Sequence, residues 1–242
     1  MRLGIITCLW KRPKLADLML RHIAALRPKG VDLVPVAAAS RIDPHWKRTT
    51  SVPGWRYVLA PNRPLSNKFN AACGLLRDQD VDAAMILGSD DFIDEAFVEM
   101  ICGHIKNHNY VAIQALYFFG AQSKEMIYAH ADRVGGGRTV SRAVLERKDY
   151  SLWQPGVNIG IDGAMDQQLH MYTPKYVGDI RDGMLCAVKL METTPTDSPH
   201  TRDNMWGLDK MKRRLDYETV PAEQVLPSHL DAKYAEALLS WS

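Results

Sequence analysis

Apolar residues in the first 110 positions follow two alternating patterns. Nearly continuous apolar runs are typical of strands buried on both faces of a parallel sheet, and they occupy 3–10, 31–39, 55–59 and 83–87. Helical spacing of apolar residues follows Pro13 and again follows Ser66. The resulting order is strand, helix, strand, loop, strand, helix, strand. With right-handed crossovers, this order predicts a parallel sheet with helices on its faces.

The pattern is less regular after residue 110. Segments 110–120 and 184–190 predict strands, and 142–150, 205–215 and 230–241 predict helices. Pro221 and Pro227 bracket a segment that we expect to be a connector. We expect one domain with two halves, 1–110 and 111–242.

Composition and charge restrict the class of protein. The chain has 242 residues, of which 46% are hydrophobic and 24% charged, and a net charge of +2. These values are ordinary for a globular protein, and the charge does not favour nucleic acid or membrane. No apolar run has the length of a membrane span or a signal peptide. Four isolated cysteines predict small buried side chains in a reducing, cytoplasmic environment: Cys8, Cys73, Cys102 and Cys186.

Two carboxylates follow the fourth predicted strand. Asp90 and Asp91 come directly after the apolar run 83–87 and Gly88. Open α/β sheets bind ligands beyond the carboxyl ends of their strands. Oxygen ligands of this kind suit Mg²⁺ or Mn²⁺, which in turn hold phosphates. The alternative is an acidic start to the next helix, with Asp94 as its cap.

The helix that follows residue 65 offers a second place for an anion. Ser66 is expected to cap it, and Lys68 and Asn70 lie near its start. A helix N-terminus carries free N–H groups and a positive dipole. The alternative is a solvated helix start. No glycine-rich fingerprint follows the first strand, which argues against a dinucleotide dehydrogenase or a P-loop enzyme.

Three segments resemble nucleotide-sugar-dependent glycosyltransferases of the GT-A fold, closest in style to family 2. Residues 7–13 resemble the opening strand and donor-binding turn of that family. Asn62 with 65–70 resembles the helix start before the metal strand, and 86–91 resembles the DxD turn. Gly88 stands where the first Asp of DxD is usual. The resemblance covers about the first 110 residues and is thin beyond them.

The resemblance implies a fold, a donor and a metal. The fold would be α/β, with a GT-A type Rossmann-like, mostly parallel sheet flanked by helices and a less regular C-terminal part on the acceptor side. A divalent ion, Mn²⁺ or Mg²⁺, would be held by Asp90 and Asp91, with His200 as a third ligand. The donor would be a nucleoside diphosphate sugar, most commonly of uridine. Its binding residues would be Thr7, Leu9, Arg12, Ser40, Asn62, Lys68, Asn70, Ser89 and Asp90.

An inverting enzyme also needs a base near the acceptor hydroxyl. Asp162 is the first candidate, because it follows an apolar segment in which Trp153 could stack on an acceptor ring. Asp166 is the second candidate. Tyr117 and Phe118 could also stack on a sugar or a base. The alternative for Asp162 is a turn or a helix cap after Gly160.

The expected function is metal-dependent, inverting transfer of a sugar to a hydroxyl of a glycan, a small molecule or a hydroxymethylated DNA base. One alternative is a sugar-phosphate nucleotidyltransferase, which would carry a glycine-rich loop after the first strand; residues 8–12 contain no glycine. Another alternative is a nucleotide-binding or structural protein with a degenerate site. The glycine at position 88, where the family usually has Asp, leaves this alternative possible.

Overall fold

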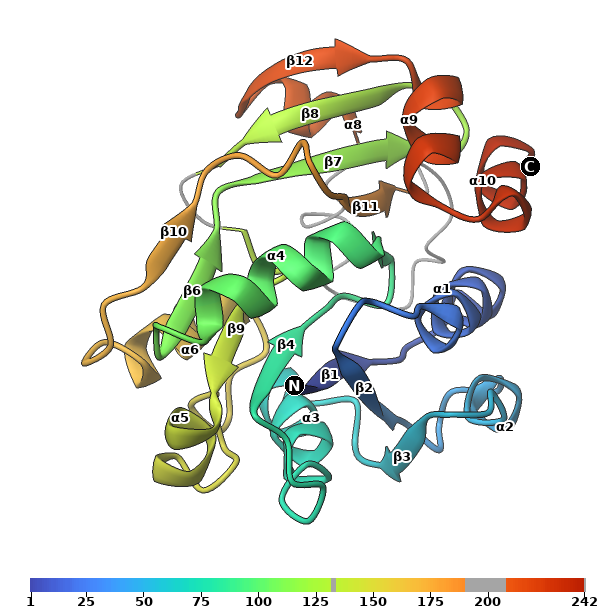
Figure 1. The fold of residues 1–242 in the computed structure, drawn as a ribbon. Helices are drawn as coiled ribbons and strands as arrows, with labels where there is room; N and C mark the ends of the chain where they lie inside the picture. Colours follow the sequence, from blue (N-terminus) through green and yellow to red (C-terminus); the bar gives the residue numbers. More distant parts are fainter. Residues whose placement is uncertain (132–133, 190–207, 242) are drawn as a thin grey trace.

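The computed structural model describes residues 1–131, 134–189 and 208–241. Its larger sheet has seven strands in the order β10-β6-β9-β4-β1-β2-β3 (Figure 1). Strands β1 to β4 run parallel, as expected, and β9 is antiparallel to both β4 and β6. The strands are β1 (Arg2–Cys8), β2 (Asp32–Ala39), β3 (Arg56–Leu59), β4 (Ala83–Ile86), β6 (Tyr110–Ile113), β9 (Thr139–Ser141) and β10 (Lys175–Val177).

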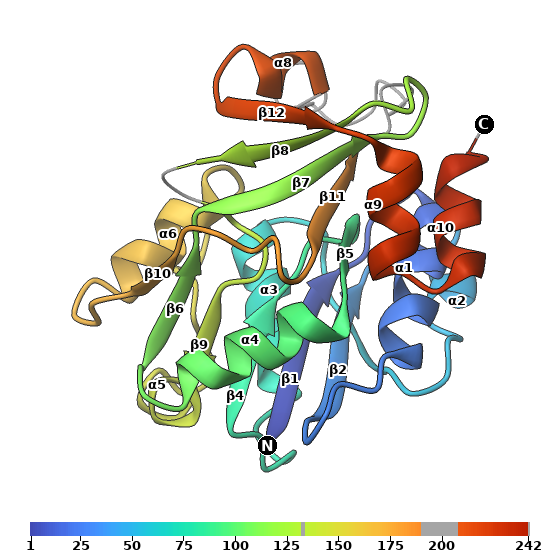
Figure 2. The ribbon, with the colours of Figure 1, turned by 45° about the horizontal axis from the view of Figure 1, so that its top comes forward.

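Helices cover both faces of this sheet. Leu3 and Ile5 of β1 pack with α1 and α4, whereas Ile6 and Cys8 pack with α3, α5 and α6. This alternation explains why the first strand is continuously apolar. In Figure 2, α4 and α3 lie on opposite sides of β1 and β4. The helices are α1 (Pro13–Ala25), α2 (Trp46–Thr49), α3 (Leu65–Gly74), α4 (Glu95–Ile105), α5 (Arg142–Arg147) and α6 (Ile161–Gln168).

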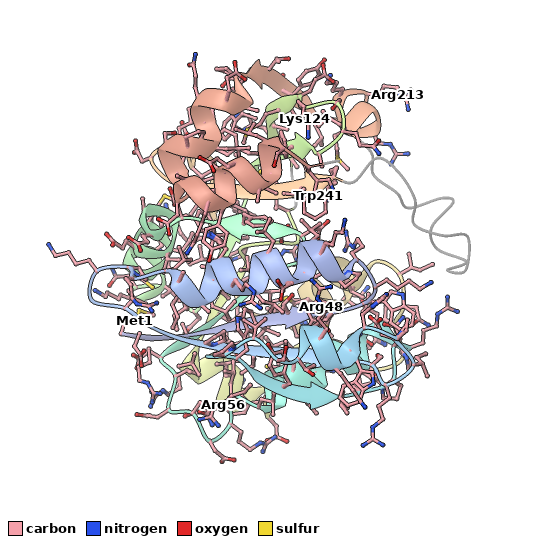
Figure 3. All side chains as sticks on the ribbon, turned by 90° about the vertical axis from the view of Figure 1, so that its right-hand side faces the viewer. Met1, Arg48, Arg56, Lys124, Arg213 and Trp241 are labelled. Carbon is pink, nitrogen blue, oxygen red and sulfur yellow. The ribbon has the colours of Figure 1, made fainter. Side chains whose placement is uncertain are left out.

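A second sheet of five strands lies beside the first, in the order β12-β8-β7-β11-β5 (Figure 1). Its strands are β5 (Asp91–Ile93), β7 (Ala115–Gly120), β8 (Met126–His130), β11 (Leu185–Lys189) and β12 (Asp216–Val220). In the last described range, 208–241, the helices are α8 (Leu208–Lys212), α9 (Ala222–His229) and α10 (Ala232–Leu239). Lys124 donates a hydrogen bond to the carbonyl of Trp241, which holds the end of the described chain (Figure 3).

Two predicted elements differ from the structure. The strand expected at 110–120 is two strands, β6 and β7, which separate at Gln114 and join different sheets. The connector expected between Pro221 and Pro227 is helix α9, which continues through Pro227. Strands β8, β9 and β12 and helix α6 were not predicted, because their short segments lack a clear apolar period.

The structure shows the alternative weighed for Asp94, and it confirms the expected burial of the cysteines. Asp94 caps α4, where its Oδ1 accepts the backbone N–H of Phe97 at 2.7 Å. The four cysteines are free and buried. Among the described residues, no helix is long and apolar enough to span a membrane.

Candidate functional site

Three segments that are distant in sequence meet at Asp90. The Oδ2 atom of Asp90 lies 3.1 Å from Nη1 of Arg12 and 3.4 Å from Nζ of Lys189. Arg12 follows β1 in the left-handed conformation, at φ 49°, and directly precedes Pro13 at the start of α1. Its Nη2 donates to Ser89 Oγ at 3.1 Å. The structure therefore brings together Arg12, Ser89 and Asp90, and adds Lys189, which no local signal in the sequence identified.

The electrostatics of Asp90 follow from this arrangement. Burial alone would disfavour the carboxylate, but the nearby charges of Lys189 and Arg12 outweigh that effect and hold the pKa of Asp90 well below its usual range. Asp90 is therefore ionised at any physiological pH. Its charge is shared between two cations.

Asp91 has different surroundings. Its Oδ2 accepts the backbone N–H of Gly88 at 2.6 Å, and the residue is buried. Burial, together with the neighbouring charge of Asp90, raises the pKa of Asp91 to about 6. A Cβ atom on Gly88 would lie 2.9 Å from Asp90 Oδ1 and 3.1 Å from Asp91 Oδ2. The two carboxylates thus occupy the space that a side chain at position 88 would need.

The described residues do not fit the divalent ion that the resemblance implies. Position 88 offers no ligand, Oδ2 of Asp90 is already paired with two cations, and Oδ2 of Asp91 accepts a backbone amide. In the described ranges, no group of three His, Cys, Asp or Glu side chains is arranged to hold a metal. His200, the expected third ligand, lies outside those ranges.

Lys68 contacts the turn after β1 from the interior of the protein. It is fully buried, and its ammonium donates to the carbonyl of Leu9 at 2.6 Å and to Asn62 Oδ1 at 3.0 Å. Burial lowers its pKa to about 8. The Trp10 ring lies 5.6 Å from the Lys68 Nζ atom. The structure therefore assembles Leu9, Asn62 and Lys68, but their polar atoms are directed at one another.

Two other residues that were predicted to bind the nucleotide-sugar donor are also buried. Ser40 donates its hydroxyl to the carbonyl of Ala60 at 2.7 Å, which ties the end of β2 to the end of β3. Thr7 is fully buried in β1, and its Oγ1 has no hydrogen-bond partner among the described residues. Neither side chain is exposed to a ligand in this structure.

The start of α3 is covered rather than open. The helix begins at Leu65, so Ser66 is not its cap as expected. The Leu65 N–H donates to Asn158 Oδ1 at 3.1 Å, and the Ser66 N–H donates to the Val157 carbonyl at 2.9 Å. Ser66 Oγ in turn accepts the Val157 N–H at 2.9 Å. A neighbouring loop therefore takes two of the amides that the predicted anion site would use.

The aromatic residues expected to stack on an acceptor are buried. Trp153 is 2% exposed, and its ring packs on Phe69 with centroids 4.9 Å apart. Tyr117 packs on Tyr128 within the second sheet at 4.8 Å, and Phe118 is 7% exposed. The stacking role predicted for these three residues is therefore wrong in this structure.

Asp162 lies in the first turn of α6, after Gly160 with φ 68°. A Cβ on Gly135 would lie 2.7 Å from one carboxylate oxygen of Asp162 and 2.8 Å from the other. A Cβ on Gly136 would lie 2.5 Å from Asp91 Oδ2. Both carboxylates therefore lie against one short glycine segment. Gly137 holds that segment beside β4, because its N–H donates to the Ile86 carbonyl at 2.7 Å.

The pKa of Asp162 is raised, first because protein atoms crowd its carboxyl group, and further by the charge of Asp166; Arg138 opposes both. The residue is nonetheless exposed at the surface. A carboxylate that is accessible and has a raised proton affinity suits a general base.

Asp166, the second candidate base, has a structural partner. Its Oδ1 accepts from Arg138 Nη1 at 2.9 Å and from the Tyr110 hydroxyl at 3.0 Å. Arg138 is 2% exposed and also donates to the carbonyls of Val134, at 2.6 Å, and Asp162, at 3.1 Å. Asp166 therefore helps to anchor the glycine segment against α6.

Two surface pockets lie away from Asp90 and Asp162. One, of about 530 Å³, is lined by residues that include Met1, Asp82 and His108. The other, of about 400 Å³, includes Gln114, His130 and Arg214. Neither contains Asp90 or Asp162, and we assign no chemistry to them.

No family model matches the chain, and no curated protein matches it in sequence. Solved structures do match. The mannosyltransferase PcManGT from Pyrobaculum calidifontis, in complex with GDP-Man and Mn²⁺, has a TM-score of 0.57 at 14% identity, over 83% of this chain and 59% of that one.

Two structures of S. aureus TarS 1-349 also match. One has a TM-score of 0.54 at 10% identity, over 78% of this chain and 61% of that one. The other, in complex with UDP-GlcNAc, has a TM-score of 0.56 at 11% identity, over 99% of this chain and 71% of that one. The chain thus spans about three-fifths of PcManGT and of the first TarS structure. These likenesses confirm the expected GT-A type α/β fold.

Proposed function

We propose that this chain transfers a sugar from a nucleoside diphosphate sugar to an acceptor hydroxyl, with inversion at the sugar carbon. The observation that carries the proposal is the placement of Asp162 and Asp91 against the same glycine segment, Gly135 and Gly136, beside the turn that contains Asp90. A candidate base and a charged turn at the carboxyl ends of the strands then belong to one site. The nucleotide sugars bound by PcManGT and TarS support this choice of donor.

In this proposal the two halves of the chain have different tasks. Residues 1–110 supply the turns after β1 and β4, which receive the donor. Residues 111–242 supply Asp162, the acceptor side and Lys189, which reaches Asp90 in the donor half. Asp166 is not the base, because Arg138 and Tyr110 already engage its Oδ1.

The reaction requires few groups. The acceptor oxygen attacks the anomeric carbon of the sugar, and Asp162 removes the hydroxyl proton. As the new C–O bond forms, the bond from that carbon to the diphosphate breaks, and the diphosphate oxygen keeps the electron pair. A base positioned in this way contributes about 10²- to 10⁴-fold to rate.

The proposal is tested with the purified chain and a panel of nucleoside diphosphates and their sugar conjugates. Binding is measured by thermal shift, and turnover by release of the nucleoside diphosphate. At about 100 times the dissociation constant, a ligand stabilises the folded state by about 2.7 kcal/mol. We expect one nucleotide to shift the melting temperature, and its sugar conjugate to be consumed.

Two results would contradict the proposal. Failure of every nucleotide to bind would remove the donor site. Release of pyrophosphate from a nucleoside triphosphate and a sugar phosphate would instead identify a nucleotidyltransferase.

A further inference from the structure

Arg12 and Lys189 form a pair of cations that reach one carboxylate oxygen from two different sheets. Arg12 follows β1 of the first sheet, and Lys189 ends β11 of the second. Both contact Oδ2 of Asp90, at 3.1 and 3.4 Å. The arginine and lysine side chains are 33% and 21% exposed, whereas that of Asp90 is 16% exposed. The cations are therefore more accessible to a ligand than the carboxylate that holds them.

The two accessible cations can receive an anion, although the neighbouring Asp91 balances part of their charge. Both cations contact Asp90, and Gly88 adds no carboxylate to the turn. Guanidinium groups bind phosphate oxygens through paired N–H donors, and ammonium groups bind them as point charges. Lys189 is also held in place by the ring of Phe118, at 5.6 Å from its Nζ.

A divalent ion fits the same point poorly. It would compete with two permanent cations for Asp90, and Asp91 Oδ2 is bonded to the Gly88 amide. A divalent ion placed beside these two cations would be repelled by both of them. Gly88 offers no ligand, and two basic side chains lie beside Asp90.

We propose that Arg12 and Lys189 bind the diphosphate of the donor and supply the positive charge that a divalent ion would otherwise supply, so that donor binding needs no metal. This inference rests on the proposed function. Asp90 is then a positioning residue, which holds both cations at one point. When the bond between sugar and diphosphate breaks, the electron pair left on the phosphate oxygen is stabilised by these two cations.

The test measures the affinity of the chain for nucleoside diphosphates, with UDP, GDP, ADP and CDP as probes, by isothermal titration calorimetry. Each titration is run in EDTA and again in Mn²⁺. We expect the dissociation constant of the nucleotide that binds to agree within about twofold between the two conditions.

Variants assign the binding to the two cations. Lys189→Gln and Arg12→Gln should each raise the dissociation constant by about tenfold, whereas Lys189→Arg, which keeps the charge, should stay within about threefold of the parent. Lys106→Gln removes the same charge from an exposed residue beyond the end of α4 and should leave affinity unchanged. Urea unfolding verifies that each variant is folded.

The outcomes separate this inference from the proposed function. Nucleotide binding that disappears in EDTA overturns the inference and leaves the glycosyltransferase proposal standing. Unchanged affinity in Lys189→Gln also overturns it, and so does an equal loss in Lys189→Arg and Lys189→Gln. Absence of binding in both EDTA and Mn²⁺ overturns the two proposals together.

Discussion

Asn70 is joined to the backbone of Trp153 by two hydrogen bonds: its Nδ2 donates to the Trp153 carbonyl at 2.8 Å, and its Oδ1 accepts the Trp153 N–H at 3.0 Å. The sequence suggested a donor-binding role for Asn70, but this geometry indicates that it fastens a loop to α3. Asn70→Asp keeps the acceptor and loses the donor. We expect the free energy of unfolding to fall by about 1–3 kcal/mol, because the carbonyl of buried Trp153 loses its partner.

Urea denaturation measures this change. Nucleotide affinity of the folded variant should match that of the parent. A variant that is fully stable but no longer binds nucleotide would show that Asn70 binds the donor.

Asp162→Asn tests the proposed base. Asparagine keeps the shape of the side chain but cannot accept the acceptor proton, so kcat should fall by about 10²- to 10⁴-fold. Donor affinity, measured by calorimetry, should be unchanged, because Asp162 is not among the groups proposed to bind the diphosphate. Asp166→Asn serves as the comparison, since we expect it to lower stability through its contact with Arg138. Retention of full activity in Asp162→Asn would move the base elsewhere.

The lowered pKa of Lys68 predicts that the stability of the folded chain depends on pH. Its pKa is lowered from 10.5 to about 8 in the folded chain by burial. Between pH 8 and 10.5 the unfolded chain therefore holds a proton on this group that the folded chain has lost, so this group makes folding more favourable as pH rises. The slope approaches about 1.4 kcal/mol per pH unit, and below pH 8 the contribution is constant.

Comparison with Lys68→Met isolates this group, because the other titrations are common to both proteins. The difference in unfolding free energy should move in favour of the parent between pH 8 and 9.5. A difference that is the same at pH 7 and pH 9.5 would show that the pKa of Lys68 is not lowered.

A substitution at Gly136 tests how closely the glycine segment approaches Asp91. In Gly136→Ala the new Cβ would lie 2.5 Å from Asp91 Oδ2, and that buried carboxylate is fixed by the Gly88 amide. We expect a loss of about 1–3 kcal/mol in unfolding free energy. Gly103→Ala is the control, because Gly103 is exposed in α4 with nothing within 4 Å, and alanine there should stabilise by about 0.5–1 kcal/mol. Equal stability of Gly136→Ala and the parent would contradict the contact.

Local periodicity was sufficient for the first half of the fold. Strands β1 to β4 and helices α1 and α3 follow directly from apolar spacing, and the sequence offered the cap at Asp94 as an alternative to a ligand role. The division at Gln114 could not be predicted in this way. A single polar residue inside an apolar run does not tell which of two sheets each side will join.

The site was predicted only in part, because some of its contacts join residues that are distant in sequence. Arg12, Ser89 and Asp90 follow strand ends that share one edge of a sheet, so their meeting could be anticipated. Lys189 reaches Asp90 across 99 positions of the chain. The burial of Trp153 depends on Phe69, and no local pattern reports that contact.

The passage of the chain from β4 to β5 has a mechanical consequence. Residues 87–90 leave the first sheet and enter the second, so Asp90 lies at the seam, with Arg12 attached to one sheet and Lys189 to the other. A diphosphate that binds both cations would clamp the two sheets together. Donor occupancy would then resist sliding of one sheet past the other, and a substitution deep in the second sheet could loosen nucleotide binding without touching the nucleotide.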